Sequence, residues 1–337
     1  MDTPGISVII PTYNRAHLLP RAIRSALAAM LPQDEIVVAD DASTDNTADM
    51  IKEFGDRVRY RKFPHGGAGV ARNHALSMAT MPLVAFLDSD DEWDADKLTL
   101  QRNLLARRPD VLFCFSNFCS RLESGEVTHN FLEQWHRDPR GWDEILGPGV
   151  PYASLAQLTK GRADFKVHIG SMYLQEMESD YVATSTVLVR REEAGAALRF
   201  ADDICVSEDK ECFGRLAGAG LGAYLDCETS VQWGHGGPRV TDVDIYALAS
   251  ARVLLLDRIW GSDPAFVAQH GDRLEKCRRE QRIKRARWLV VRGRTREARA
   301  DLREAGSCPL SLKMLAALPG PMARGLLKVR RLVRGER

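Results

Sequence analysis

Three aspartates stand close together in PLVAFLDSDDEW (82–93), where Asp88, Asp90 and Asp91 follow an apolar run. An apolar run of this length is typical of a buried β-strand. Such a strand delivers the residues after it to the carboxyl edge of a sheet, which is where open α/β sheets bind ligands. Two carboxylates one residue apart can share Mg²⁺ or Mn²⁺, ions that prefer oxygen ligands and often also hold substrate phosphates. The alternative is a polar loop whose aspartates make turns and cap the next helix.

Another acidic pair, Glu208 and Asp209, follows Ser207 at the start of a predicted helix over 207–218. A serine N-cap and acidic residues in the first turn stabilise a helix by themselves. A purely structural role is therefore one interpretation of this pair. The other is that its carboxylates belong to the same site as the three aspartates.

Two glycine-rich segments could bring backbone close to a ligand. The first, Gly66-Gly67-Ala68-Gly69, precedes a predicted helix, where backbone N–H groups can bind an anion. Its alternative is a plain turn between strand and helix. The second, WGHGG (233–237), flanks His235 with glycines, which allow close approach, although a loop histidine is usually only solvated.

Apolar and amphipathic segments alternate over the first 118 residues. We expect strands over 6–11, 35–39, 58–63, 83–87 and 111–118. We expect helices over 15–31, capped by Asn14, over 43–54, capped by Ser43 or Thr44, and over 70–80 and 94–107. This alternation predicts a βαβ series with a mainly parallel sheet. Because Tyr13, Asp40 and Asp88 each follow a predicted strand, these polar groups should converge at one edge of the sheet.

The second half of the chain is less regular at first and then helical. Residues 119–180 are too long for a bare loop, so we expect short helices and mobile segments there, with a role as a lid or in acceptor binding. Strands are predicted over 181–190, 221–227 and 230–233, and helices over 242–260, 264–292 and 295–305.

Length and composition narrow the class of protein. A chain of 337 residues predicts one large domain, or one with an appendage. No apolar run approaches the ~18 residues of a membrane span, and MDTPG at the start lacks the features of a signal peptide. The seven cysteines include no Cys-x-x-Cys pair, which fits a reducing compartment and argues against a zinc site.

Charge is distributed unevenly along the chain. Residues 270–337 contain 20 Lys and Arg against 7 Asp and Glu, a net charge of +13, whereas the whole chain carries only +1. The amphipathic stretch 309–334 within this block could lie on an anionic membrane, or pack on the protein with its arginines solvated. No recognisable nucleic-acid-binding module accompanies the charge, so we expect no nucleic-acid partner.

Five segments resemble, in order and spacing, the motifs of family-2 glycosyltransferases, which are inverting enzymes with the GT-A nucleotide-sugar-binding fold. They are ISVIIPTYNR (6–15), VVADDASTDNT (37–47), GGAGVARNHAL (66–76), LVAFLDSDDEW (83–93) and SEDKECFGRLA (207–217). The resemblance implies an α/β, Rossmann-like, mainly parallel mixed sheet flanked by helices. It implies a GT-A domain over 1–240, with a donor half over 1–118 and an acceptor and base half over 119–240. A basic, mostly helical extension over 241–337 would follow.

The resemblance also implies which residues would bind the nucleotide. They are Pro11, Thr12, Tyr13, Asp40, Arg72 and Asp88. Thr12 and Tyr13 would line the nucleoside site, and Asp40 would accept a hydrogen bond from the base. Arg72 would approach the nucleotide, and Asp88 would face the ribose.

Metal and catalytic roles are implied in the same way. Asp88 and Asp90 form the Asp-x-Asp pair, in which Asp90 would bind Mg²⁺ or Mn²⁺, with His235 near the metal and the diphosphate. Asp209 would be the general base, supported by Glu208. A divalent ion neutralises the charge of a diphosphate leaving group, and a carboxylate on the opposite face of the sugar can take the proton from an acceptor hydroxyl.

The implied partners are a nucleotide-diphosphate sugar, with a UDP-sugar preferred, and a hydroxyl of a glycan, a lipid-linked glycan or another cell-surface precursor. The implied location is cytoplasmic, with peripheral attachment to the inner face of the plasma membrane through 309–334. Two residues depart from the family pattern: Ala42 stands where glycine is common, and Lys210 stands where an aromatic residue is frequent and acceptor fit could be affected.

Two alternatives stay open at this point. One is a catalytically degenerate GT-A protein that only binds nucleotides, although Asp88, Asp90 and Asp209 are all present. The other is a sugar-phosphate nucleotidyltransferase, but those enzymes have a glycine-rich basic loop where this chain has PTYNRAH. A dinucleotide oxidoreductase is less well supported, because no G-x-G-x-x-G follows the first strand.

Overall fold

The computed structural model describes residues 3–234 and 244–326. The chain divides into two compact units, residues 1–237 and 238–337. The predicted domain boundary at residue 240 lies outside the described residues, as does His235.

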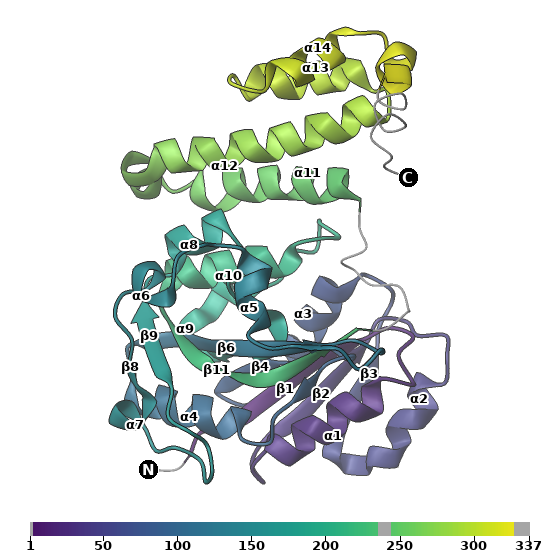
Figure 1. Ribbon diagram of the computed structural model, residues 1–337. Coiled ribbons are helices and arrows are strands. Elements are labelled where there is room, and N and C mark those ends of the chain that lie inside the picture. The colour runs from purple at the N-terminus through teal and green to yellow at the C-terminus, as the bar shows by residue number, and fades with distance from the viewer. Residues whose placement is uncertain (1–2, 235–243, 327–337) are drawn as a thin grey trace. The chain divides into compact units, whose positions relative to one another are not determined.

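The first unit is built on one large mixed sheet (Figure 1). Its strand order is β3-β2-β1-β4-β10-β6-β11-β9-β8. The bounds are β1 Ile6–Thr12, β2 Glu35–Asp40, β3 Val58–Lys62, β4 Leu83–Phe86, β5 Glu92–Trp93, β6 Val111–Arg121, β7 Val127–Thr128, β8 Val150–Pro151, β9 Lys166–Gly170, β10 Leu188–Arg190 and β11 Leu221–Trp233. Strands β1, β2, β3 and β4 pair in parallel, and β6 pairs in parallel with β11. Because β10 is antiparallel to both β4 and β6, all six of these strands point the same way.

Helices cover both faces of the sheet. Those of the first unit are α1 Leu19–Ala29, α2 Thr47–Met50, η1 Ile51–Arg57, α3 Ala68–Met78, α4 Lys97–Arg107, α5 Phe131–His136, α6 Trp142–Ile145, α7 Tyr152–Leu155, α8 Tyr173–Glu178, η2 Thr184–Thr186, α9 Arg191–Ala194, η3 Gly195–Ala197 and α10 Glu208–Ala219. Helices α1 and α4 share one core with the sheet, and α3 and α10 share the other (Figure 1). Successive strand residues point to opposite faces, so in β1 Val8 enters the first core and Ile9 the second. The predicted α/β class with a mainly parallel mixed sheet is confirmed.

The two N-caps predicted after the first strands are wrong. Helix α1 begins at Leu19, and Asn14 instead has a left-handed backbone, with φ of 51°. Its Oδ1 accepts a hydrogen bond from the backbone N–H of Thr44 at 2.7 Å, while Ser43 Oγ accepts one from the N–H of Asn14 at 2.8 Å. The ends of β1 and β2 lie side by side, so these side chains cap each other's loops rather than the next helix.

Three other local predictions also need correction. Within 181–190 only β10 is a strand, because Thr184–Thr186 forms a 3₁₀ turn. The strands predicted over 221–227 and 230–233 are one strand, β11, with register shifts in its middle. Ser207 precedes α10 but has φ of 62°, and its side chain makes no capping hydrogen bond.

The second unit is helical, as predicted. Its described elements are α11 Ile245–Leu255, η4 Leu256–Trp260, α12 Pro264–Val291, α13 Thr295–Glu304 and α14 Leu310–Ala317, with residues 320–326 also helical. Helix α12 starts with a local signal: the Asp263 carboxylate accepts hydrogen bonds from the N–H groups of Ala265 and Phe266, and Pro264 occupies the first turn. Among the described helices, none has the length and apolarity to cross a membrane.

Candidate active site

The carboxyl ends of the parallel strands bring the predicted polar residues to one edge. Thr12 and Asp40 are register partners at the ends of β1 and β2, and Asp88 follows β4 by two residues. Thr12 is buried and its Oγ1 has no hydrogen-bond partner among the described residues. Pro11, next to it in β1, is buried as well.

The three aspartates of the acidic turn after β4, residues 88–91, differ in their exposure to solvent. The side chains of Asp88 and Asp90 are 32% and 25% exposed, whereas Asp91 is 7% exposed. Burial, together with the charges of Asp88 and Asp90, raises the pKa of the Asp91 carboxyl well above its usual range. Arg15 approaches the open side of the turn, with its Nη2 3.8 Å from Asp90 Oδ2.

This donor set fits a divalent cation. Two partly exposed carboxylates in a crowded, negatively charged turn offer the hard oxygen ligands that Mg²⁺ and Mn²⁺ prefer. Within residues 3–234 and 244–326, no three acidic, histidine or cysteine side chains are arranged to hold a metal on their own. Asp88 and Asp90 would therefore share the ion with substrate oxygens, as such sites usually do.

Arg72 links this turn to the start of α10. Its Nη2 donates to Asp88 Oδ1 at 2.7 Å and its Nη1 donates to Glu208 Oε1 at 2.9 Å. The Arg72 residue is 6% exposed. Burial alone would lower its pKa, but the two carboxylates raise the pKa of Arg72 above its usual range and keep it charged. The arginine that was expected to approach the nucleotide thus joins two carboxylates from opposite halves of the unit.

Asp209 lies beside this bridge in the first turn of α10. Burial and the neighbouring Glu208 carboxylate raise the pKa of Asp209 to about 6. A carboxyl group with a pKa near neutrality is a better proton acceptor than an ordinary aspartate. The arrangement therefore offers a carboxyl group suited to accept a proton and, in the acidic turn, carboxylates suited to hold a cation.

The first glycine-rich segment, residues 66–69, binds a carboxylate of the protein itself and allows two helices to pack closely. The N–H groups of Gly66 and Gly67 donate to the Asp41 carboxylate at 2.7 and 2.9 Å, so they are already used within the protein. A Cβ atom on Gly69 would lie 2.8 Å from the carbonyl oxygen of Ala201 and from Cγ of Glu208. Gly69 is needed because α3 approaches the start of α10 this closely.

At the ends of β1 and β2, two predicted residues, Tyr13 and Asp40, lie among groups that the sequence did not single out. Tyr13 is 46% exposed and its ring lies 4.8 Å from that of His65, whose Nδ1 is 2.9 Å from Asp41 Oδ2. Asp40 is fully buried: Oδ1 accepts from the N–H of Ser43, and Oδ2 accepts from the hydroxyl of Tyr60. Asp41 stands directly after Asp40, the last residue of β2, and this position was the available signal for it, whereas the place of His65 depends on the tertiary structure.

Comparison with known proteins decides the family. The model of Glycosyl transferase family 2 matches residues 7–181, more than half of the chain. The chain belongs to this family.

Two sequence relatives are β-1,3-glucosyltransferases of Escherichia coli, both named as acting between UDP-Glc and alpha-D-GlcNAc-diphosphoundecaprenol. WfgD is 37% identical over 121 residues, which cover 35% of this chain and 47% of the relative. WfaP is 38% identical over 116 residues, which cover 34% and 45%. The chain thus spans about half the length of these relatives.

Solved structures agree with the family on the fold. S. aureus TarS in complex with UDP is 17% identical, with a TM-score of 0.59, over 92% of this chain and 82% of that chain. The mannosyltransferase PcManGT from Pyrobaculum calidifontis, in complex with GDP-Man and Mn²⁺, is 17% identical, with a TM-score of 0.51, over 98% and 81%. This likeness confirms the GT-A-type fold.

Two departures of this family-2 chain from the expected pattern have local explanations. Ala42 has φ of 68°, a conformation that glycine adopts without strain, which accounts for the glycine common at this place. Lys210 is 4% exposed, and its Nζ donates to the carbonyl oxygen of Ser179 at 2.9 Å and to Asp180 Oδ1 at 3.0 Å. The lysine therefore fastens the segment before β10 to α10, beside Asp209.

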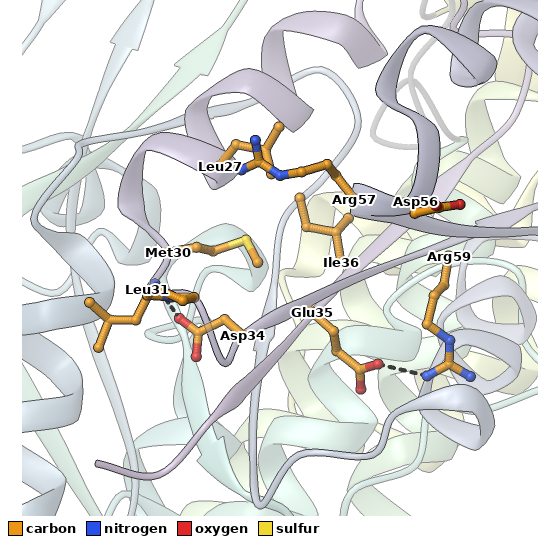
Figure 2. A pocket seen from close by; sticks show the side chains of 10 residues that line it. Leu27, Met30, Leu31, Asp34, Glu35, Ile36, Asp56, Arg57 and Arg59 are labelled. Atoms are coloured by element: carbon orange, nitrogen blue, oxygen red, sulfur yellow. Dashed lines mark hydrogen bonds and ion pairs between the residues drawn. The ribbon is translucent and has the colours of Figure 1, made fainter. Parts of the chain in front are cut away.

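A cavity of about 610 Å³ lies at the other edge of the sheet (Figure 2). Its lining residues are Leu27, Met30, Leu31, Pro32, Asp34, Glu35, Ile36, Asp56, Arg57 and Arg59. They come from the end of α1 and the amino ends of β2 and β3. Glu35 pairs with Arg59 at 2.6 Å across the cavity (Figure 2). This position separates the cavity from the acidic turn, because parallel strands carry their two ends to opposite edges.

Proposed function

We propose that this chain is an inverting glycosyltransferase. It transfers a sugar from a nucleotide-diphosphate donor, a UDP-sugar in the first place, to a hydroxyl of a glycan, a lipid-linked glycan or another cell-surface precursor. The observation that carries the proposal is the Arg72 bridge, which brings Asp88 and Glu208 to one edge although they are 120 positions apart. The printed names of the relatives, with UDP-Glc as donor and a diphosphoundecaprenol acceptor, support the substrate classes.

In this proposal one group of residues acts on the diphosphate and another acts on the acceptor hydroxyl, at opposite faces of the sugar. Asp90 and Asp88, with His235, would hold Mg²⁺ or Mn²⁺, and the ion would supply neutralisation of the diphosphate charge. Exposed Tyr13 offers a ring face to the nucleobase. Asp209 takes the proton of the acceptor hydroxyl as its oxygen attacks the anomeric carbon. Because attack and departure occur on opposite faces, the anomeric configuration inverts. Glu208, fixed by Arg72, keeps the pKa of Asp209 raised.

A calorimetric titration with UDP, GDP, dTDP, CDP and ADP tests the donor site. We expect one nucleotide to bind in the presence of Mn²⁺ and to lose at least about tenfold in affinity with EDTA, because the diphosphate charge is then unshielded. The Asp90→Ala variant should show the same loss with Mn²⁺ present. Failure of all five nucleotides to bind the wild type with Mn²⁺ would contradict the proposed function and favour a degenerate GT-A protein.

A membrane role for the basic end is a separate proposal. Leu310 and Met314 on α14 are 72% and 63% exposed, and Met322 and Leu326 on the next helical segment are 57% and 53% exposed. The opposite sides of these segments are buried in the core of the second unit, so the exposed side chains are not needed for that core. A strongly basic block with exposed apolar side chains suits an anionic bilayer, such as the inner face of the plasma membrane. The predicted stretch 309–334 continues past the described residues.

Replacement of these four exposed residues by glutamine should release the protein from membranes. We expect co-sedimentation with phosphatidylglycerol-containing vesicles at low salt to fall by at least about tenfold, because each apolar side chain contributes on the order of 1 kcal/mol when buried. A matched control replaces Leu122 and Val150, exposed apolar residues of the first unit, by glutamine. Equal co-sedimentation of wild type and the fourfold variant would mean that these four apolar side chains do not insert into lipid.

A further inference from the structure

One serine holds both ends of the acidic turn. Ser185 lies in η2 and is 6% exposed. Its Oγ accepts a hydrogen bond from the backbone N–H of Asp88 at 3.1 Å and donates one to Asp91 Oδ2 at 2.5 Å. A hydroxyl that accepts from the start of a turn and donates to its end fixes the distance between them. No motif in the sequence indicated this role, because Ser185 is almost one hundred positions away from the turn.

The turn is anchored on its far side as well. The Asp91 carboxylate also accepts a hydrogen bond from the backbone of Trp233, at the end of β11. The indole N–H of Trp93 donates to the carbonyl oxygen of Ser185 at 2.6 Å, and this bond holds the serine in place. Asp91 is therefore held inside the protein, whereas the side chains of Asp88 and Asp90 stay partly exposed.

We propose that Ser185 is a positioning residue that sets the geometry of Asp88 and Asp90 for a divalent cation. This inference rests on the proposed function. Mg²⁺ requires near-octahedral oxygen ligands at ~2.0–2.1 Å, so a small rotation of the turn changes the fit. Hydrogen bonds from neighbouring residues that orient the metal-binding side chains typically account for about 10–100-fold in metal affinity. Without its hydroxyl the turn loses the bond at each end, and the positions of Asp88 and Asp90 are then fixed less closely.

The test measures Mn²⁺ binding itself. Free Mn²⁺ is followed by electron paramagnetic resonance during titration of the full chain in the presence of UDP. We expect Ser185→Ala to bind Mn²⁺ about 10–100-fold more weakly than the wild type. Ser185→Thr should stay within about threefold, because threonine keeps the hydroxyl. The matched control is Ser116→Ala, which removes another buried hydroxyl, 2.6 Å from Thr229 Oγ1, and should leave Mn²⁺ affinity unchanged.

The outcomes separate this inference from the proposed function. Equal Mn²⁺ affinity in the wild type and Ser185→Ala overturns the positioning role and leaves the metal site intact. Equal weakening in Ser185→Ala and Ser116→Ala also overturns it, since the effect would then be general destabilisation. Absence of Mn²⁺ binding by the wild type with every nucleotide of the calorimetric series overturns the proposed metal site and the inference together. If Ser185→Ala does not fold, Ser185→Cys replaces it, and unweakened Mn²⁺ binding by that variant overturns the inference.

Discussion

Replacement of Asp209 by asparagine is expected to lower kcat by about 10²–10⁴-fold, the usual contribution of a general base. Asparagine has nearly the same shape but cannot accept the proton of the acceptor hydroxyl. Binding of UDP with Mn²⁺ should persist, because Asp209 lies outside the acidic turn. The measurements are steady-state transfer kinetics and calorimetry on the same preparation. Asp202→Asn, which removes an exposed carboxylate paired with Arg199, is the matched control and should remain active.

Full activity of Asp209→Asn would rule out its role as the base. A further check comes from the pH dependence. The base works in its ionised form, and the pKa of Asp209 is raised to about 6, so kcat/KM should fall about tenfold per unit below pH 6 and level off above it. Since the Glu208 carboxylate contributes to this shift, Glu208→Gln should move the fall to lower pH. A profile that is flat between pH 5 and 7 would contradict the assignment.

Replacement of Arg72 by alanine is expected to have the largest effect on stability. The substitution leaves Glu208 buried and unpaired and removes a partner of Asp88, and breaking a buried pair in this way costs about 3–5 kcal/mol. The free energy of unfolding, measured with urea, should fall by that amount. Affinity for UDP with Mn²⁺ should fall as well, because Asp88 loses the group that orients it.

Two variants test the origin of that cost. Arg59→Ala removes a half-exposed arginine from its ion pair with Glu35 and should cost at most about 1 kcal/mol. Arg72→Ala combined with Glu208→Gln should recover part of the lost stability, since a neutral amide is less costly to bury than an unpaired charge. An Arg72→Ala protein as stable as the wild type would show that the bridge does not stabilise the fold.

Those residues of the candidate site that lie at the ends of strands could be predicted from the sequence. Strands covered on both faces must be apolar along their whole length, so the polar residues that follow them mark the edge where ligands bind. Tyr13, Asp40 and Asp88 were located in this way, and the structure places them at or just after the carboxyl ends of β1, β2 and β4. Their proposed roles stay predictions, as does that of His235, which lies outside the described residues.

The partners of each polar group could not be found from the sequence. Asn14 and Ser43 have good helix-capping side chains, but β1 and β2 are neighbours in the sheet, and the two residues bond to each other's loops instead. Asp40 occupies a predicted binding position, yet it is fully buried and its carboxylate accepts a hydrogen bond from the hydroxyl of Tyr60. The preference of such a side chain for capping the next helix is about 1 kcal/mol. It is outweighed when the fold brings another hydrogen-bond partner closer.

The sequence by itself determined the family, the order of strands and helices over the first 118 residues, and the acidic residues of the candidate site, because these depend on residue type and short-range spacing. The tertiary structure alone decided that Arg72 joins Asp88 to Glu208, which lies 136 positions after Arg72, and that Ser185 fastens the acidic turn. Such contacts depend on which segments the sheet places side by side. No local pattern records that order, since it follows from the packing of the whole unit.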